Sequence, residues 1–210
     1  MDIGKYQKIE FRRKFWKFFG AEVKAVNPDN DTVVGVIRMK AFKLRDDVRL
    51  YVPAESNQEA MRIHARQVID FGATYDVYLG ADNNPAFSLQ RKGFKSAFVR
   101  DYWKLLDPAG NQIGYVQETS SGLAVARRWF GMIPFVGEIV DLIFAFIPQT
   151  YGIYAGQDNL DTKADATITH RKNPLIVKMS LDASGAEQDY NPYFGIAAVS
   201  LLSVLDASKN

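Results

Sequence analysis

Cysteine is absent from this chain of 210 residues, and histidine occurs only twice, as His64 and His170. Without cysteine the chain has no disulfides, no thiolate nucleophile and no sulfur ligands for a metal. The two histidines lie far apart in sequence with no third ligand at metal-binding spacing, so we expect no metal site and no cofactor. Excess charge is also lacking, because 26 basic residues face 24 acidic ones. A dedicated nucleic-acid-binding domain is usually strongly basic, so we expect no nucleic-acid partner.

Long uninterrupted apolar runs are missing too. The longest, 132–147, contains Pro134, Glu138 and Asp141, and the first residues carry scattered charges without an apolar core. The sequence therefore predicts neither a membrane-spanning helix nor a signal peptide. We expect a cytoplasmic protein. If it acts at a membrane, we expect it to bind peripherally at the inner face.

Recognisable catalytic patterns are the third absence. The run from Gly93 to Ser96 lacks the lysine and glycine spacing of a phosphate-binding loop, and no nucleophile elbow occurs. The acidic clusters that begin at Asp29, Asp158 and Asp182 lack the glycine that a calcium loop needs at its sixth position. We expect a protein that is not an enzyme.

The sequence is rich in short segments of alternating polarity. In the first of these, Ile9, Phe11 and Arg13 share one face, and turn-forming residues separate most of the segments. Alternation of this kind predicts strands, and many short strands predict a β-sandwich or a β-barrel. We expect one domain over 1–210, mainly β, with a helical insertion near 120–147. The expected strands cover 9–15, 23–26, 33–42, 48–52, 60–71, 74–79, 87–92, 97–106, 112–118, 151–155, 164–170 and 175–181.

The last apolar segment, 194–205, reads FGIAAVSLLSVL and is apolar on every face of a helix. As a helix it is about 18 Å long, whereas the hydrocarbon core of a bilayer is about 30 Å thick. A helix that is apolar all round must be buried, and the remaining host is the strand-rich part of the same chain. We therefore expect a closed barrel wrapped around its own C-terminal helix.

A family resemblance supports this interpretation. The ordered series ARQVIDFGATYDVY at 65–78, RKGFKS at 91–96, RDYW at 100–103 and IPQTY at 147–151 resembles the tubby C-terminal-like superfamily, especially its LURP-one-related and phospholipid-scramblase-like branch. The resemblance implies a closed antiparallel barrel of about twelve strands with the helix threaded through it. It also implies binding of membrane lipid such as phosphoinositides. Scramblase-like activity is the least favoured of these functions, because the acylated cysteines and the calcium loop of animal scramblases are missing.

Two basic segments are candidates for binding anions or lipid headgroups, with a solvated barrel exterior as the alternative. Adjacent residues of a strand face opposite sides, so Arg91 and Lys92 cannot both point outward unless the chain bends at Gly93. Arginine and tryptophan ahead of an apolar helix are typical of a membrane interface. The candidates are Arg91, Lys92, Lys95, Arg100, Arg127, Arg128, Trp129 and Phe130.

The segment 132–147 presents a wide apolar surface if it is helical. It would pack over the barrel, meet a protein partner or a second copy of the chain, or dip into a membrane. Its acidic residues, Glu138 and Asp141, argue against an anionic bilayer. The candidate interaction residues are Val136, Ile139, Val140, Ile143 and Phe144.

Three functions follow, in order of preference. The first is a non-enzymatic barrel that docks reversibly on membrane phospholipid with anionic or phosphoinositide-like headgroups. The second is a protein-interaction module, with a partner protein or a homodimer bound through 132–147. The third, an enzyme or a carrier of small molecules, is disfavoured because the helix is expected to fill the barrel.

Overall fold

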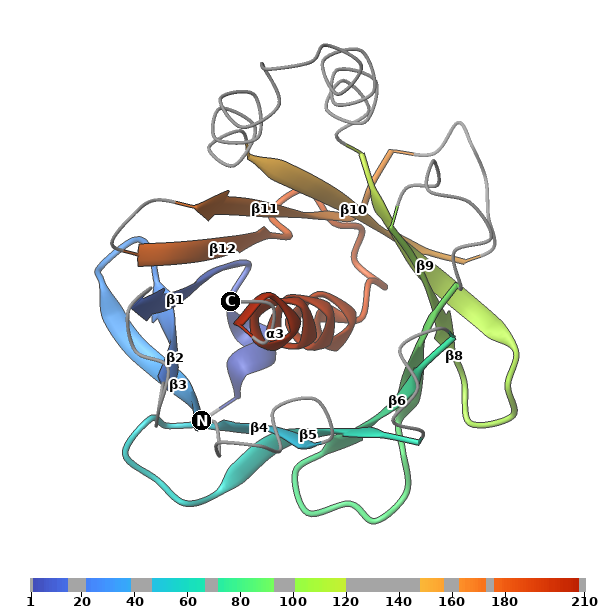
Figure 1. The fold of residues 1–210 in the computed structure, drawn as a ribbon, viewed down its shortest axis with the longest axis horizontal. Coiled ribbons are helices and arrows are strands. Elements are labelled where there is room, and N and C mark those ends of the chain that lie inside the picture. Colours follow the sequence, from blue (N-terminus) through green and yellow to red (C-terminus); the bar gives the residue numbers. More distant parts are fainter. Residues whose placement is uncertain are drawn as a thin grey trace, which may run out of the picture.

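A computed structural model describes residues 2–14, 22–38, 47–66, 72–92, 101–119, 148–156, 163–172 and 176–207. Twelve strands among them form a closed antiparallel barrel (Figure 1). Each strand pairs with its neighbours in sequence, and β1 closes the ring against β12. The mainly-β barrel expected from the sequence is confirmed.

The bounds of the elements are as follows. A short 3₁₀ helix, η1, covers Ile3–Lys5, and the C-terminal helix α3 covers Pro192–Ala207. The strands are β1 Lys8–Lys14, β2 Glu22–Asn27, β3 Thr32–Arg38, β4 Asp47–Tyr51, β5 Glu59–Ala65, β6 Thr74–Leu79, β7 Phe87–Arg91, β8 Tyr102–Leu106, β9 Gln112–Glu118, β10 Gln149–Ala155, β11 Ala166–Lys172 and β12 Ile176–Asp182.

The alternation in the sequence places one face of each strand inside the barrel. In β1, Ile9 and Phe11 are buried and Lys8 is exposed, and β12 alternates along its whole length. Three strands are shorter than expected. The predicted range 33–42 continues into undescribed residues after Arg38. The predicted ranges 60–71 and 97–106 were too long within the described residues, because β5 ends before the bend at Arg66 and β8 begins only after Asp101. The whole of the expected helical insertion near 120–147 also lies outside the described residues.

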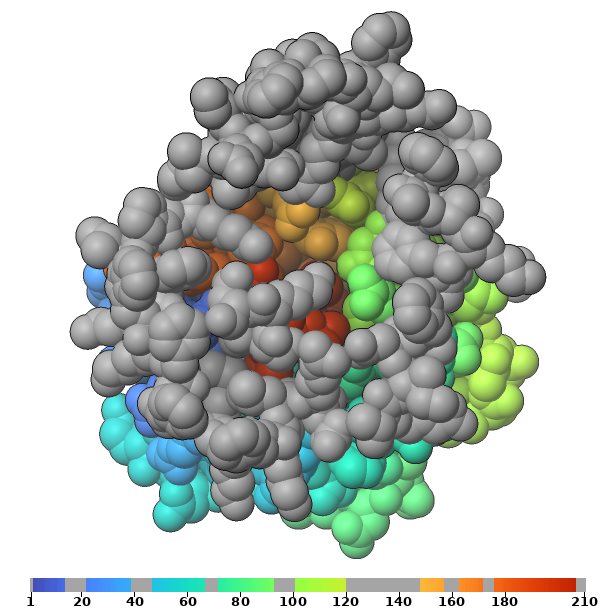
Figure 2. Space-filling model, viewed as in Figure 1, coloured from blue at the N-terminus to red at the C-terminus, as the bar shows by residue number. Residues whose placement is uncertain are grey.

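Helix α3 lies inside the barrel (Figure 1), and a few of its atoms are visible near the centre of the space-filling view (Figure 2). Its start is marked by Pro192 and by Asn191, whose side-chain oxygen accepts a hydrogen bond from the backbone N–H of Tyr193 at 3.0 Å. Ile196 and Val199 are completely buried, and burial of each such side chain stabilises the fold by about 1.5–3 kcal/mol. The helix is therefore the core of the barrel, as its sequence predicts.

The helix packs mainly against β1, β4, β5, β11 and β12. Large aromatic side chains are buried on the inner face of the strands opposite. Phe87 on β7 meets Phe194 edge-on with ring centroids 5.0 Å apart, and Tyr75 and Trp103 lie 5.9 Å apart. These rings lie in the interior between α3 and β6–β8. In the described part of the chain, side chains of the helix and of the strands therefore both occupy the interior of the barrel.

The two rims of the barrel differ in which strand ends they hold. Because neighbours run antiparallel, all odd-numbered strands end at one rim and all even-numbered strands end at the other. Asp206, near the end of α3, lies within 4 Å of Arg13 and His170, near the ends of β1 and β11. We call this rim the helix-exit rim, and the opposite one, where η1 contacts the start of α3, the helix-entry rim.

Candidate functional site

The connections between strands fall into two sets because of this topology. Those that leave and re-enter the barrel at the helix-exit rim are 15–21, 39–46, 66–73, 92–101, 119–148 and 173–175. Those at the helix-entry rim are 28–31, 52–58, 80–86, 107–111, 156–165 and, leading into α3, 183–191. Both basic segments singled out in the sequence therefore join strands at the same rim.

The two sets have opposite compositions. The helix-exit connections contain ten basic and five acidic residues, and they hold 13 of the 17 Phe and Trp residues of the chain. The helix-entry connections contain ten acidic residues, a single lysine, and neither Phe nor Trp. A barrel needs apolar side chains inside its wall, but it has no need to gather aromatic residues in the connections of one rim. The helix-exit rim is therefore the candidate functional surface.

Arg91 and Lys92 are the predicted site residues that the structure describes, and they point to different surroundings. Arg91 is in register with the buried Trp103, and its guanidinium lies 5.5 Å from that ring. Its Nε donates a hydrogen bond to Asp101 Oδ1 at 3.1 Å, so a carboxylate balances its charge. The prediction that adjacent residues face opposite sides of the strand agrees with this arrangement.

Lys92 is exposed, and its ammonium lies 5.3 Å from the centroid of the Tyr102 ring. No carboxylate of the described residues lies within ion-pair distance of it. The other predicted residues lie outside the described part of the chain. They are Lys95, Arg100, Arg127, Arg128, Trp129 and Phe130, together with Val136, Ile139, Val140, Ile143 and Phe144.

A stack of three tyrosines, which the sequence analysis missed, continues from Lys92 across the outer face of β8, β9 and β10. The rings of Tyr102 and Tyr115 are 5.7 Å apart, and those of Tyr115 and Tyr154 are 4.5 Å apart and nearly parallel. Gly152 leaves room for Tyr154, since a Cβ there would lie 2.6 Å from the Tyr154 hydroxyl oxygen. The stack depends on cross-strand register, which the sequence pattern alone does not supply.

Charged side chains are also buried just inside the helix-exit rim. Nη2 of Arg13 lies 3.7 Å, and Nε2 of His170 lies 3.6 Å, from the same oxygen of Asp206, and all three residues are less than a tenth exposed. Burial lowers the pKa of the Arg13 guanidinium, and the nearby Asp206 carboxylate partly offsets this. The group joins the end of α3 to β1 and β11.

Metal-binding clusters and membrane-spanning helices are absent from the described residues. These residues contain no cluster of three or more His, Asp or Glu residues that could hold a metal ion. None of the helices among them has the length and apolar character needed to cross a membrane. Comparison of the chain with protein-family models, curated proteins and solved structures found no match.

Proposed function

We propose that this protein is a non-enzymatic barrel that docks reversibly on anionic membrane phospholipid through its helix-exit rim. The observation that carries the proposal is the composition of the connections: those of the helix-exit rim are rich in basic residues, Phe and Trp, whereas those of the opposite rim are acidic and contain neither Phe nor Trp. Aromatic side chains partition into the interface of a bilayer, and each nearby Lys or Arg adds about 1 kcal/mol of attraction to an anionic leaflet.

Lys92 and Tyr102, the ring of the stack beside it, support the same proposal, whereas Tyr115 in the middle of the stack is buried. Lysine can extend its charge to a headgroup while its stem rests on an aromatic ring, and tyrosine combines an apolar body with a polar hydroxyl. Lys92 above Tyr102 provides both features where β7 meets the rim. Arg91 has a different role, because its contacts with Asp101 and Trp103 hold the strand ends that carry this surface.

Sedimentation with vesicles tests the proposal. Vesicles of phosphatidylcholine alone are compared with vesicles that also contain phosphatidylserine or a phosphoinositide, at low and at physiological salt. We expect binding to the anionic vesicles that weakens as salt rises. Absence of binding to every anionic vesicle at low salt would overturn the proposal.

A matched pair of variants locates the surface. Lys92→Glu reverses a charge at the helix-exit rim, and Lys163→Glu makes the same change at an exposed residue of the helix-entry rim. We expect Lys92→Glu to weaken vesicle binding about tenfold or more, since two charge units are changed near the membrane, and Lys163→Glu to have little effect. Equal effects of the two variants would place docking elsewhere.

Self-association is the alternative use of the same rim, because the proposed interaction segment 132–147 belongs to one of its connections. Light scattering distinguishes the two functions. A concentration-dependent dimer that is lost in Ile139→Asp, in a protein that does not bind vesicles, would favour the interaction module.

A further inference from the structure

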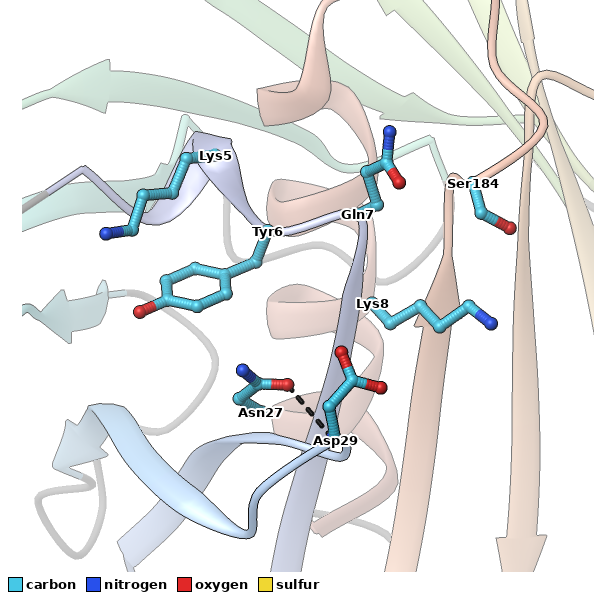
Figure 3. A pocket seen from close by; sticks show the side chains of 7 residues that line it. All are labelled: Lys5, Tyr6, Gln7, Lys8, Asn27, Asp29 and Ser184. Carbon is cyan, nitrogen blue, oxygen red and sulfur yellow. Dashed lines mark hydrogen bonds between the residues drawn. The ribbon is translucent and has the colours of Figure 1, made fainter.

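A cleft of about 440 Å³ opens near the helix-entry rim, on the opposite side of the barrel from the proposed membrane surface. Figure 3 shows the side chains that line it. It is lined by the segment 5–8, which joins η1 to β1, by Asn27 and Asp29 at the β2–β3 turn, and by Ser184 after β12. Its volume lies within the range of about 300–1,000 Å³ that is usual for small-molecule sites.

The charges of the lining favour a neutral ligand. The ammonium of Lys8 lies 3.7 Å from Asp182, and that of Lys5 lies over the Tyr6 ring, 5.2 Å from its centroid. Asp29 contributes a carboxylate to the same cleft, on a rim whose connections are acidic. An anion would meet this carboxylate, and a cation would meet the two lysines. An apolar ligand would find little apolar surface besides Tyr6.

Several polar groups of the lining remain available to hydrogen-bond a ligand. The Asn27 oxygen accepts a hydrogen bond from the backbone N–H of Asp29 at 3.0 Å, which leaves the Asn27 amino group as a donor. In the described part of the chain, the side chains of Gln7 and Asp29 make no hydrogen bond, and both are exposed. The amide of Gln7 supplies a donor and an acceptor, and the carboxylate of Asp29 supplies acceptors.

We propose that this cleft binds a sugar. A sugar is uncharged, and each of its hydroxyl groups both donates and accepts a hydrogen bond. One of its C–H faces can rest against the Tyr6 ring once the Lys5 side chain, which lies over that ring, moves aside. Amide and carboxylate side chains beside one tyrosine match these needs. The sugar reaches the cleft either free in solution or as the headgroup of a glycolipid. The proposal does not depend on membrane docking by the other rim.

Saturation-transfer NMR tests it with the methyl glycosides of glucose, galactose and mannose and with N-acetylglucosamine, each added to the full chain. Because the cleft is open, we expect weak binding, with a Kd of roughly 1 mM for at least one sugar. Transfer to none of them would overturn the proposal. Vesicles that carry the preferred sugar as a glycolipid, compared with vesicles of the same charge without it, distinguish the two sources.

Matched variants test whether the sugar binds in this cleft. Gln7→Ala and Asp29→Ala remove one polar group each from the cleft, whereas Gln58→Ala and Glu55→Ala remove the same kinds of group from exposed residues outside it. We expect the first pair to weaken binding about tenfold and the second pair to leave it unchanged. Thermal melting checks that all four variants are folded. Sugar binding that survives Gln7→Ala combined with Asp29→Ala would overturn the assignment.

Discussion

Gly114 on β9 shows how closely neighbouring strands approach each other. A Cβ at this position would lie 2.6 Å from the backbone oxygen of Tyr154 and 2.9 Å from a methyl group of Leu105. The backbone of β10 would have to move, so we expect Gly114→Ala to lower the free energy of unfolding by about 1–3 kcal/mol. Urea denaturation measures this. Gly185→Ala is the control, because the nearest atom to its Cβ is Lys163 Nζ at 3.6 Å. Equal stability of the two variants would contradict the close approach.

Asp76 is a second single residue that affects the stability of the fold, and its effect depends on pH. Burial raises the pKa of this carboxyl group, but hydrogen bonds from Arg66 Nε at 2.7 Å and Ser88 Oγ at 2.6 Å outweigh burial and lower it. A lowered pKa means that the carboxylate stabilises the fold above its unfolded pKa of about 3.9, and that this contribution is lost as pH falls through the folded pKa.

We therefore expect Asp76→Asn to lower the free energy of unfolding by about 1–3 kcal/mol at neutral pH, and by progressively less below about pH 4. Urea titrations of both proteins across this pH range provide the measurement. Asp82→Asn, at an exposed turn, is the control and should change little at any pH. A stability difference for Asp76→Asn that does not change with pH would show that the carboxylate charge is not its cause.

The ion pair between Arg13 and Asp206 links two elements, the first strand and the last helix. Both side chains are buried, and their closest charged atoms are 3.7 Å apart. Removal of one partner leaves a buried charge uncompensated, so Asp206→Ala should lower the free energy of unfolding by about 3–5 kcal/mol. Replacement of both partners by apolar residues, as Arg13→Met with Asp206→Leu, should restore most of it. A double variant no more stable than Asp206→Ala would refute this explanation.

The elements were predictable from the sequence where local pattern determines them. Helix α3 was expected because FGIAAVSLLSVL is apolar on every face, and the strands because inward residues such as Ile9 and Phe11 alternate with polar ones. The pattern also placed Arg13 on the inward face. Its partners could not be predicted, because Asp206 is 193 residues away and meets it only after the barrel closes. The tyrosine stack likewise depends on register across three strands.

At the scale of the whole molecule, the sequence contains the difference in composition between the connections of the two rims. The difference can be recognised only when the strand order shows which connections share a rim. Phe15, Phe42, Phe94 and Trp129 lie in four separate connections. Only the up-and-down order of the strands assigns these connections to one rim and the acidic connections to the other. The connections of one rim then hold an excess of basic residues and those of the other an excess of acidic residues, although the totals for the chain nearly cancel. Net charge was therefore a poor guide to the candidate surface.

This separation of charge predicts how salt affects vesicle binding. Strands of seven residues, such as β1, are about 23 Å long and, tilted in the barrel, hold the rims roughly 15–20 Å apart. Electrostatic screening acts over about 30 Å at 0.01 M salt but only about 8 Å at 0.15 M. With the helix-exit rim on an anionic membrane, the acidic rim is repelled at low salt and is screened at physiological salt.

A variant that combines Glu55→Gln, Glu187→Gln and Asp189→Asn removes three exposed carboxylates from the helix-entry rim. We expect it to bind phosphatidylserine vesicles more tightly than the unmodified protein at 0.01 M salt, and equally tightly at 0.15 M. Vesicle sedimentation at the two salt concentrations measures this, and the variant that combines Asn57→Gln with Gln188→Asn controls for substitution on the same surface. A gain that persists at 0.15 M would mean that the acidic rim lies against the membrane, which is the reverse of the proposed orientation.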